Sequence, residues 1–215
     1  MTWHTLERRE LAQALTEAGP DAPTLCEGWQ ARHLAAHVVL RESSLLVPVG
    51  LAVPPLADRA ERAIEDLAEA GLSEGGFRDL VARVAAEPPA WHPMTWAGDA
   101  ANLVEFFVHT EDVRRGDGTV EDRELEPERE QALWAQLLRA ARLTYRKVAA
   151  GVVLVRPDGV RRVVKRPARG FGTVVVRGSV ADLLLHGFGR GAATRVTVEG
   201  APTDVDTVRE ALPFA

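Results

Sequence analysis

Proline and glycine breaks limit the first two thirds of this chain to helices of modest length that must pack against one another. The breaks at Gly19-Pro20, Pro54-Pro55 and Gly116-Asp117-Gly118 each interrupt a region in which apolar residues recur at helical spacing. Asp99 suits the cap of one helix, and Pro127 suits the first turn of another. We therefore expect helices at residues 4–18, 30–46, 57–70, 77–86, 99–115 and 127–148.

Short runs of β-branched residues replace the helical periodicity after Gly151. Val152–Val155 and Val160–Lys165 flank the turn sequence Arg156-Pro157-Asp158-Gly159, which predicts a β-hairpin. Further strands are expected at 173–176 and 195–199, and helices at 179–186, with Ser179 as cap, and 204–212. The sequence thus predicts an α+β protein, with a four-helix bundle of the up-down kind over residues 1–148 and a small α/β domain over residues 149–215.

Composition excludes several functional classes. The chain has 215 residues, a net charge of -5 and no long basic run, so we expect no nucleic-acid partner. Cys26 is the sole cysteine, which excludes an internal disulfide and suits a reducing cytoplasm. No stretch of about 18 apolar residues occurs, so we expect no membrane span and no membrane partner. Composition leaves the choice between monomer and dimer open.

A carboxylate and an imidazole stand four residues apart in Glu105-Phe106-Phe107-Val108-His109. On a helix this spacing puts both side chains on one face, one turn apart. Burying a charged group in such an apolar run is costly unless the group is paired or binds a metal. Exposed Glu–His pairs at this spacing are also common, so the pair alone is weak support for a metal.

The helix expected at residues 30–46 supplies a third ligand. His37 lies among small and apolar residues, and four residues earlier His33 lies beside Arg32, close to the start of the helix. The neighbours favour His37 as the residue that points into the bundle, with His33 as its competitor. Two histidines and a carboxylate leave a fourth position open, which is the pattern of a catalytic zinc site. Nickel, iron and manganese accept the same ligands.

Several segments resemble the DinB-like helical bundles, and within them the mycothiol-dependent maleylpyruvate isomerase family of actinobacteria. The resemblance covers nearly the whole chain, and its nearest subgroup is one described only as metal-binding. The residues that carry it are Thr24-Leu25-Cys26-Glu27-Gly28-Trp29, Leu34-Ala35-Ala36-His37, Asn102 to Arg115 and Ala181 to Arg190.

The resemblance implies a zinc site formed by His37, Glu105 and His109, and mycothiol as a co-substrate. A metal-bound thiol loses its proton readily, which suits isomerisation or thiol transfer on a small electrophilic or anionic substrate. The family also draws an arginine from its tail domain into the active site, and Arg190 is the matching residue. The segment Thr110-Glu111 departs from the isomerase pattern, which usually has arginine and tryptophan there, so the substrate stays open.

Two other residues bear on the site. Asp112 follows His109 by three residues and could support it as a hydrogen-bonding carboxylate, or pair with Arg115. Cys26 is either a packing residue, a reactive thiol or a fourth ligand. A fourth protein ligand would close the site. It would favour the alternative function, a non-catalytic metal-binding protein whose tail domain binds an apolar ligand or partner.

Overall fold

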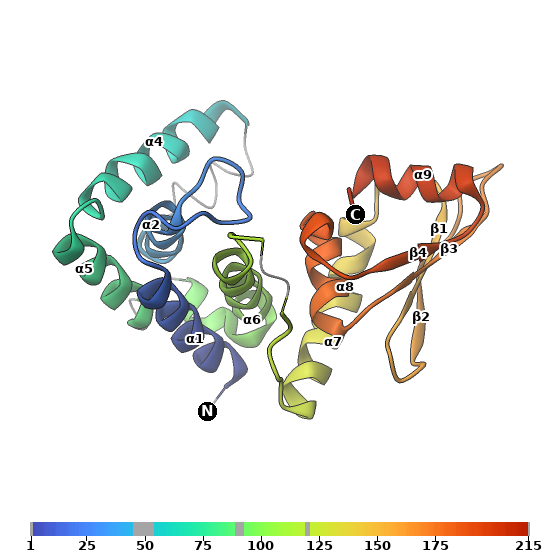
Figure 1. Cartoon of the computed structure of the whole chain (residues 1–215), viewed down its shortest axis with the longest axis horizontal. Coiled ribbons are helices and arrows are strands. Elements are labelled where there is room, and N and C mark those ends of the chain that lie inside the picture. Colours follow the sequence, from blue (N-terminus) through green and yellow to red (C-terminus); the bar gives the residue numbers. More distant parts are fainter. Residues whose placement is uncertain (1, 45–53, 89–92, 119–120, 215) are drawn as a thin grey trace. The chain divides into compact units, whose positions relative to one another are not determined.

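The computed structural model describes residues 2–44, 54–88, 93–118 and 121–214. Contacts between Cα atoms divide the chain into two compact units, Met1–Thr119 and Val120–Ala215, and each is described by itself (Figure 1). The first unit is built from helices, and the second combines helices with a four-stranded sheet, which confirms the predicted α+β class. None of the described helices is both long and apolar enough to cross a bilayer.

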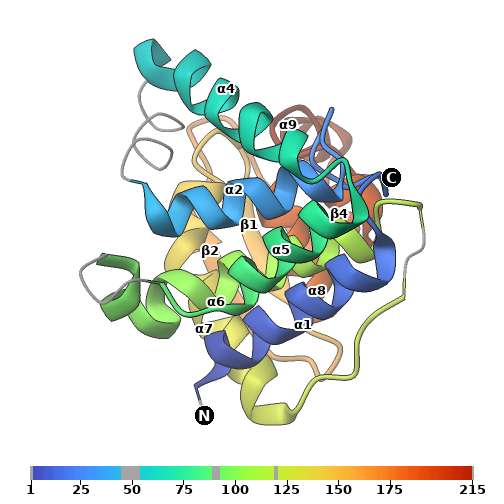
Figure 2. The same cartoon turned by 90° about the vertical axis from the view of Figure 1, so that its left-hand side faces the viewer.

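In the first unit each helix packs against the helix beside it, in an order that differs from their order along the chain. Figure 2 views them in the order α4, α2, α5 and α1, with each in contact with the next, while α6 packs on α1. Their bounds are Trp3–Ala18 for α1, Ala31–Ser43 for α2, Pro54–Ala70 for α4, Glu74–Ala85 for α5 and Pro93–Arg114 for α6.

Four of these helices share one hydrophobic core. Fully or almost fully buried side chains from α1, α2, α5 and α6 contact one another there, among them Leu15, Leu34, Leu80 and Phe106. Helix α4 adds a smaller cluster on the opposite side of α2, centred on Ile64. The core is therefore closed by residues at helical spacing, as the sequence predicted for this part of the chain.

Helix α6 differs from its predicted form at its start. It begins at Pro93 and not at Asp99, and it is broken at Gly98, where φ is 53° and the left-handed backbone favours glycine. The Asp99 carboxylate accepts a hydrogen bond from the backbone N of His4, 2.8 Å away in the first turn of α1. The predicted end of α2 beyond Ser44, and Trp91 and His92, lie outside the described residues.

One buried ion pair ties the helices of the first unit together. The Arg8 guanidinium on α1 donates to both carboxylate oxygens of Glu42 on α2, at 2.7 and 2.5 Å. It also donates to the carbonyls of Val84 and Ala86 at the end of α5, both at 2.9 Å. Its centre lies 4.5 Å from the ring of Phe106 on α6. Arg8 thus contacts all four helices that form the core.

We expect Glu42→Ala to lower the free energy of unfolding by about 3–5 kcal/mol, because the Arg8 charge would stay buried without its carboxylate. The double variant Arg8→Met with Glu42→Leu should recover most of that loss, since it leaves no buried charge. Denaturant unfolding followed by circular dichroism measures both changes. Arg78→Ala is the control, because Arg78 and Glu74 form an exposed pair that contributes about 0.5 kcal/mol or less. Equal losses in Arg78→Ala and Glu42→Ala would contradict this account.

The second unit begins with a helix and continues as a sheet with two further helices. The order of strands in the sheet is β2-β1-β3-β4, in which β1 and β3 are parallel and the outer pairs are antiparallel. The elements are α7 (Pro127–Thr144), β1 (Gly151–Val155), β2 (Arg161–Lys165), β3 (Thr173–Arg177), α8 (Val180–Gly187), the 3-10 turn η1 (Gly191–Ala193), β4 (Thr197–Glu199) and α9 (Pro202–Ala211).

The predicted hairpin and the predicted helix cap are confirmed. Strands β1 and β2 pair in antiparallel register across the turn that contains Gly159, where φ is 84°. The Ser179 hydroxyl accepts from the backbone N of Asp182 at 3.1 Å, as an N-cap does. A Cβ on Gly151 would lie 2.5 Å from the hydroxyl oxygen of Thr173 on β3 and 2.8 Å from Pro167 in the loop after β2, so glycine is required there.

Helix α7 belongs by its contacts to the second unit. It packs on α8, and Leu133, Trp134 and Leu137 are its buried residues along that core. The sequence predicted a change of character near residue 148, whereas the division by contacts lies earlier, between Thr119 and Val120. The difference arises because the apolar stripe of α7 is covered by elements that follow it in the chain.

His186 on α8 is buried in the second unit. Its Nδ1 accepts a hydrogen bond of 2.9 Å from the hydroxyl of Tyr145, and both side chains are inaccessible to solvent. Burial lowers the pKa of His186 to about 4, because an imidazolium ion would lose its hydration there. Histidine in an unfolded chain has a pKa of about 6.5, so the unfolded chain takes up this proton first.

We expect the contribution of neutral His186 to the free energy of unfolding to be fully present above pH 6.5. It should fall as the pH drops towards 4, because in that window only the unfolded state takes up the proton at His186. Between pH 7 and pH 5 the loss from His186 should be about 2 kcal/mol. His186→Gln keeps an acceptor for Tyr145 and should remove that part of the pH dependence. Denaturant unfolding at the two pH values measures the difference. An equal loss of unfolding free energy between the two pH values in the parent chain and in His186→Gln would rule out His186 as the cause.

Candidate metal centre

The structure brings together the three residues that the sequence singled out as metal ligands. His37 lies on α2, and Glu105 and His109 lie one turn apart on α6. One ligand atom from each residue falls within 4.8 Å of the other two. Both histidines are buried, whereas the Glu105 side chain keeps 30% of its surface exposed. Solvent therefore reaches this group of side chains at the carboxylate.

The distances within the group suit a tetrahedral metal ion. Glu105 Oε1 lies 3.2 Å from His109 Nε2 and 3.5 Å from His37 Nε2. Ligand atoms at zinc bond lengths of 2.0–2.1 Å and tetrahedral angles are separated by about 3.3 Å. The imidazole rings meet edge to face, with centroids 5.2 Å apart, and the two distances show that both Nε2 atoms face the carboxylate. The side chains present therefore fit a small divalent ion without a large rearrangement.

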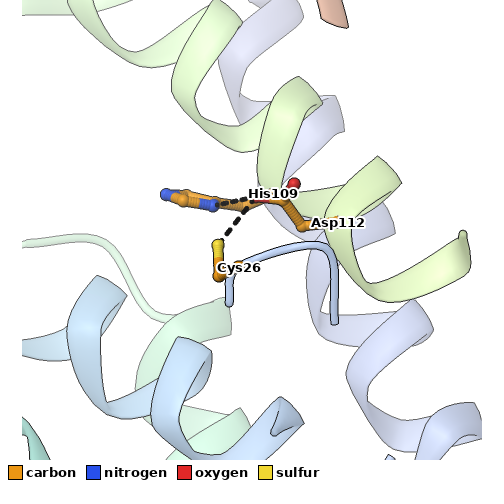
Figure 3. Close-up of side chains that lie close together, drawn as sticks. All are labelled: Cys26, His109 and Asp112. Carbon is orange, nitrogen blue, oxygen red and sulfur yellow. Dashed lines mark hydrogen bonds and ion pairs between the residues drawn. The ribbon is translucent and has the colours of Figure 1, made fainter. Parts of the chain in front are cut away.

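A second carboxylate holds the far side of the His109 ring. His109 Nδ1 lies 2.9 Å from Asp112 Oδ2, one turn further along α6. The thiol of Cys26 donates to the same oxygen at 3.3 Å, and Figure 3 shows ring and thiol both directed at this carboxylate. A carboxylate on the outer nitrogen is the usual support of a metal-binding histidine, since it fixes the ring orientation. This arrangement agrees with the supporting role considered for Asp112.

The loop that carries Cys26 is attached firmly to α6. The backbone N of Leu25 donates to the carbonyl of Asp112 at 2.9 Å. A Cβ on Gly116 would lie 2.0 Å from the carbonyl oxygen of Pro23, so only glycine permits this approach. The hydroxyl of Thr24 donates to the carbonyl of Trp29 and accepts from the backbone N of Cys26. These contacts fix the position of the thiol beside Asp112.

Arg41 is a member of the site that the sequence analysis missed. Its Nε lies 3.2 Å from Glu105 Oε1, the oxygen that faces both histidines. The Asn102 side chain and the carbonyl of Ala101 accept from its other nitrogens, at 3.1 and 3.2 Å. Arg41 follows His37 by four residues on α2, so the same spacing rule that paired Glu105 with His109 could have identified it.

Burial and the neighbouring polar groups together shift the pKa of all three residues. Burial alone would raise the pKa of Glu105, but hydrogen bonds from His109 and His37 and the charge of Arg41 hold it well below its usual range. Burial would lower the pKa of His109, yet Asp112, Cys26 and Glu105 together raise it well above the usual value. Burial lowers the pKa of His37. The group therefore contains one strongly basic and one weakly basic imidazole.

His33 points away from this group, towards the start of its own helix. Its Nδ1 accepts from the backbone N of Gln30 at 3.1 Å, which forms half of a capping box on α2. Its Nε2 lies 3.2 Å from a carboxylate oxygen of Glu65 on α4. Both ring nitrogens are thus engaged elsewhere, so the geometry favours His37 over His33 as the inward-facing histidine.

His37 has one nitrogen that remains without a partner. Within the described part of the chain its Nδ1 is buried and accepts or donates no hydrogen bond. The ring of Trp29 packs beside it, with centroids 5.4 Å apart. His37 is therefore positioned by packing on one side and by Glu105 on the other.

Arg190, expected to contact substrate, lies in the second unit immediately before η1. Its guanidinium donates to the carbonyl of Phe188 at 2.7 Å, and the side chain is half-buried. This contact within the second unit neither supports nor opposes a substrate role, so Arg190 stays a prediction.

Two solved structures share the fold of this chain. A histidine-to-alanine variant of the mycothiol-dependent maleylpyruvate isomerase aligns over 92% of this chain and 90% of its own, with a TM-score of 0.58 and 22% identity. The mycothiol-dependent maleylpyruvate isomerase itself aligns over the same shares, with a TM-score of 0.51 and 20% identity. The likeness confirms the predicted resemblance at the level of the fold.

Comparisons of sequence alone gave no such match. No protein-family model matches the chain, and no curated protein does.

Proposed function

We propose that His37, Glu105 and His109 bind a divalent metal ion, zinc by preference, in a DinB-like four-helix bundle formed by α1, α2, α5 and α6. The observation that carries the proposal is the separation of 3.2–3.5 Å between Glu105 Oε1 and the two Nε2 atoms, which suits tetrahedral coordination. Asp112 supports His109 from behind, as in other metal sites. Nickel, iron or manganese would accept the same ligands.

We further propose that the site acts on a small thiol, with mycothiol as the co-substrate. The support is the shared fold with the mycothiol-dependent maleylpyruvate isomerase. A bound metal would lower the pKa of a coordinated thiol, and the resulting thiolate is the nucleophile. Three protein ligands leave room for that sulfur, and Glu105 is the member of the group that solvent reaches. Isomerisation or thiol transfer on a small electrophile follows from this chemistry.

The protein side chains have separate parts in this proposal. Asp112 keeps the His109 ring oriented, and Arg41 holds Glu105 by an ion pair of 3.2 Å. Arg190 is the residue we assign to the anionic group of the substrate, on the strength of the family resemblance alone. Its replacement by glutamine should raise KM more than it lowers kcat, because a binding contact is lost.

We expect His37→Ala, Glu105→Ala and His109→Ala each to lose the metal, because two remaining ligands seldom hold zinc tightly. His33→Ala should keep it, since His33 contacts Gln30 and Glu65 instead. Elemental analysis of protein purified without added metal gives the metal content per chain, and circular dichroism checks that the variants are folded. Full metal occupancy in His37→Ala, or loss in His33→Ala alone, would overturn the assignment.

A turnover screen tests the thiol step. Mycothiol is offered with a panel of small electrophiles, with and without a chelator, and product formation is followed. Activity should require the thiol, disappear with the chelator and return when zinc is added back. His33→Ala is the matched control, since it replaces a histidine of the same helix outside the ligand group. Activity that survives complete metal removal would refute the metal-dependent mechanism.

A closed, non-catalytic metal site is the second candidate, and one observation favours it. The sulfur of Cys26 and ligand atoms of His109 and Asp112 also lie within 4.8 Å of one another. This second group lies at Nδ1 of His109, whereas Glu105 faces Nε2. If the second group binds the ion in place of the first, Cys26→Ser should lower metal affinity sharply, and metal removal should lower stability without any thiol chemistry. If the site is open, Cys26→Ser should leave the metal content unchanged. The same elemental analysis decides between the two.

A further inference from the structure

Positive charge is concentrated in one stretch of the second unit. From Arg139 to Arg177 the chain carries eleven lysine and arginine residues and a single acidic residue, Asp158. Asp158 is already paired with Arg156 at 3.0 Å. The net charge of -5 for the whole chain conceals this concentration. A local field of one sign attracts ligands of the opposite sign whatever the total charge is.

Part of this charge forms one face, where the end of α7 meets the edge strand β2. Arg142 and Arg146 lie one turn apart, and the Lys165 ammonium donates to the carbonyl of Arg146 at 3.2 Å. An open groove of about 710 Å³ runs between Arg142, Val163, Val164, Lys165 and Arg166. We define the α7–β2 face as the six residues Arg142, Leu143, Arg146, Val163, Lys165 and Arg166.

The cations of this face have no internal counter-charge. In the ranges that the structure describes, none of Arg142, Arg146, Lys165 and Arg166 lies within ion-pair distance of a carboxylate. Arg142, Arg146 and Arg166 are exposed and Lys165 is half-buried. Arg78 and Arg209, by contrast, are exposed cations that each pair with an acid on their own helix. The four cations of the α7–β2 face are therefore available to an external anion.

Two exposed aliphatic side chains accompany these cations, since Val163 lines the groove and Leu143 follows Arg142 on α7. Val163 on β2 is 69% exposed and Leu143 on α7 is 63% exposed. Aliphatic side chains surrounded by lysine and arginine suit the boundary between anionic headgroups and acyl chains. Nucleic-acid bases stack on aromatic side chains, and none of the six residues of this face is aromatic.

We propose that the α7–β2 face binds the surface of an anionic phospholipid bilayer. The cations contact the headgroup phosphates, and Leu143 and Val163 enter the acyl boundary. No spanning segment is needed for such peripheral binding, so the absence of a membrane-crossing helix among the described residues does not oppose it. The lack of a long apolar run in the sequence bears only on segments that cross a bilayer, and not on peripheral binding.

The test is co-sedimentation of the full chain with vesicles. Vesicles of phosphatidylcholine alone are compared with equimolar phosphatidylcholine and phosphatidylglycerol at low and physiological salt. Binding should require the anionic lipid and weaken with salt. Each lysine or arginine near an anionic surface changes the partition coefficient about fivefold, so Arg142→Gln with Lys165→Gln and Arg166→Gln should lower it by about 100-fold.

Two further variants test the position of the charge and the part of the aliphatic side chains. Arg59→Gln with Arg62→Gln and Arg78→Gln, all exposed residues of the first unit, changes the net charge equally and should bind vesicles like the parent chain. Leu143→Ser with Val163→Ser should lower vesicle binding several-fold and leave binding to heparin, a soluble polyanion, unchanged.

Several outcomes would overturn the proposal. These are no binding to anionic vesicles at low salt, equal binding to neutral and anionic vesicles, or equal losses in the two triple-glutamine variants. Tighter binding to a DNA duplex than to anionic vesicles, with the same sensitivity to Arg142, Lys165 and Arg166, would assign the face to nucleic acid instead. None of these results depends on the metal, so the outcome is independent of the function proposed for the helical unit.

Discussion

The Arg8–Glu42 pair is the interaction on which the helical unit and its candidate site depend. It places a full charge from α1 and one from α2 inside an apolar core, where neither is tolerated alone. Arg8 also donates to the end of α5 and lies over the ring of Phe106 on α6, so a single guanidinium contacts all four helices of the core. Glu42 is preceded on α2 by Arg41, which faces Glu105, so the pair also helps to position the α2 side of the candidate site.

The consequence is a continuous series of opposite charges that leads from this pair to the candidate metal centre. Arg41 lies 3.9 Å from Glu42 on one side and 3.2 Å from Glu105 on the other. Glu105 faces His109 at 3.2 Å, and His109 faces Asp112 at 2.9 Å. The position of the Glu105 oxygen is thus set by three groups that compete for it. A metal ion would take the place of the proton that His109 now shares with this carboxylate.

The sequence predicted much of the local structure and part of the site. His37, Glu105 and His109 were found because two rules acted together, the spacing of four residues on a helix and the cost of a polar group in an apolar run. The same spacing rule applies to Arg41, but an arginine near the end of a helix is usually exposed, so the sequence does not indicate its contact with Glu105.

What escaped prediction depends on pairs far apart in the chain. His4 with Asp99, Arg8 with Glu42 and Tyr145 with His186 join residues that are 34 to 95 positions apart, and spacing contains no information about them. The membership of α7 escaped for the same reason, since its apolar stripe does not state which partner covers it. Local propensity fixes the elements, whereas tertiary pairing decides what each element belongs to.

The effect of charge is also hard to predict from the sequence, because it depends on where the charged residues lie in the folded chain. Residues 1–119 hold 10 lysine and arginine residues against 19 acidic ones, and residues 120–215 hold 16 against 12. The averaged value of -5 describes neither unit. The negative charge of the helical unit favours the divalent cation proposed at Glu105, and the positive charge of the second unit favours anions. The two halves of the chain are therefore suited to ligands of opposite sign, which a single net charge could not reveal.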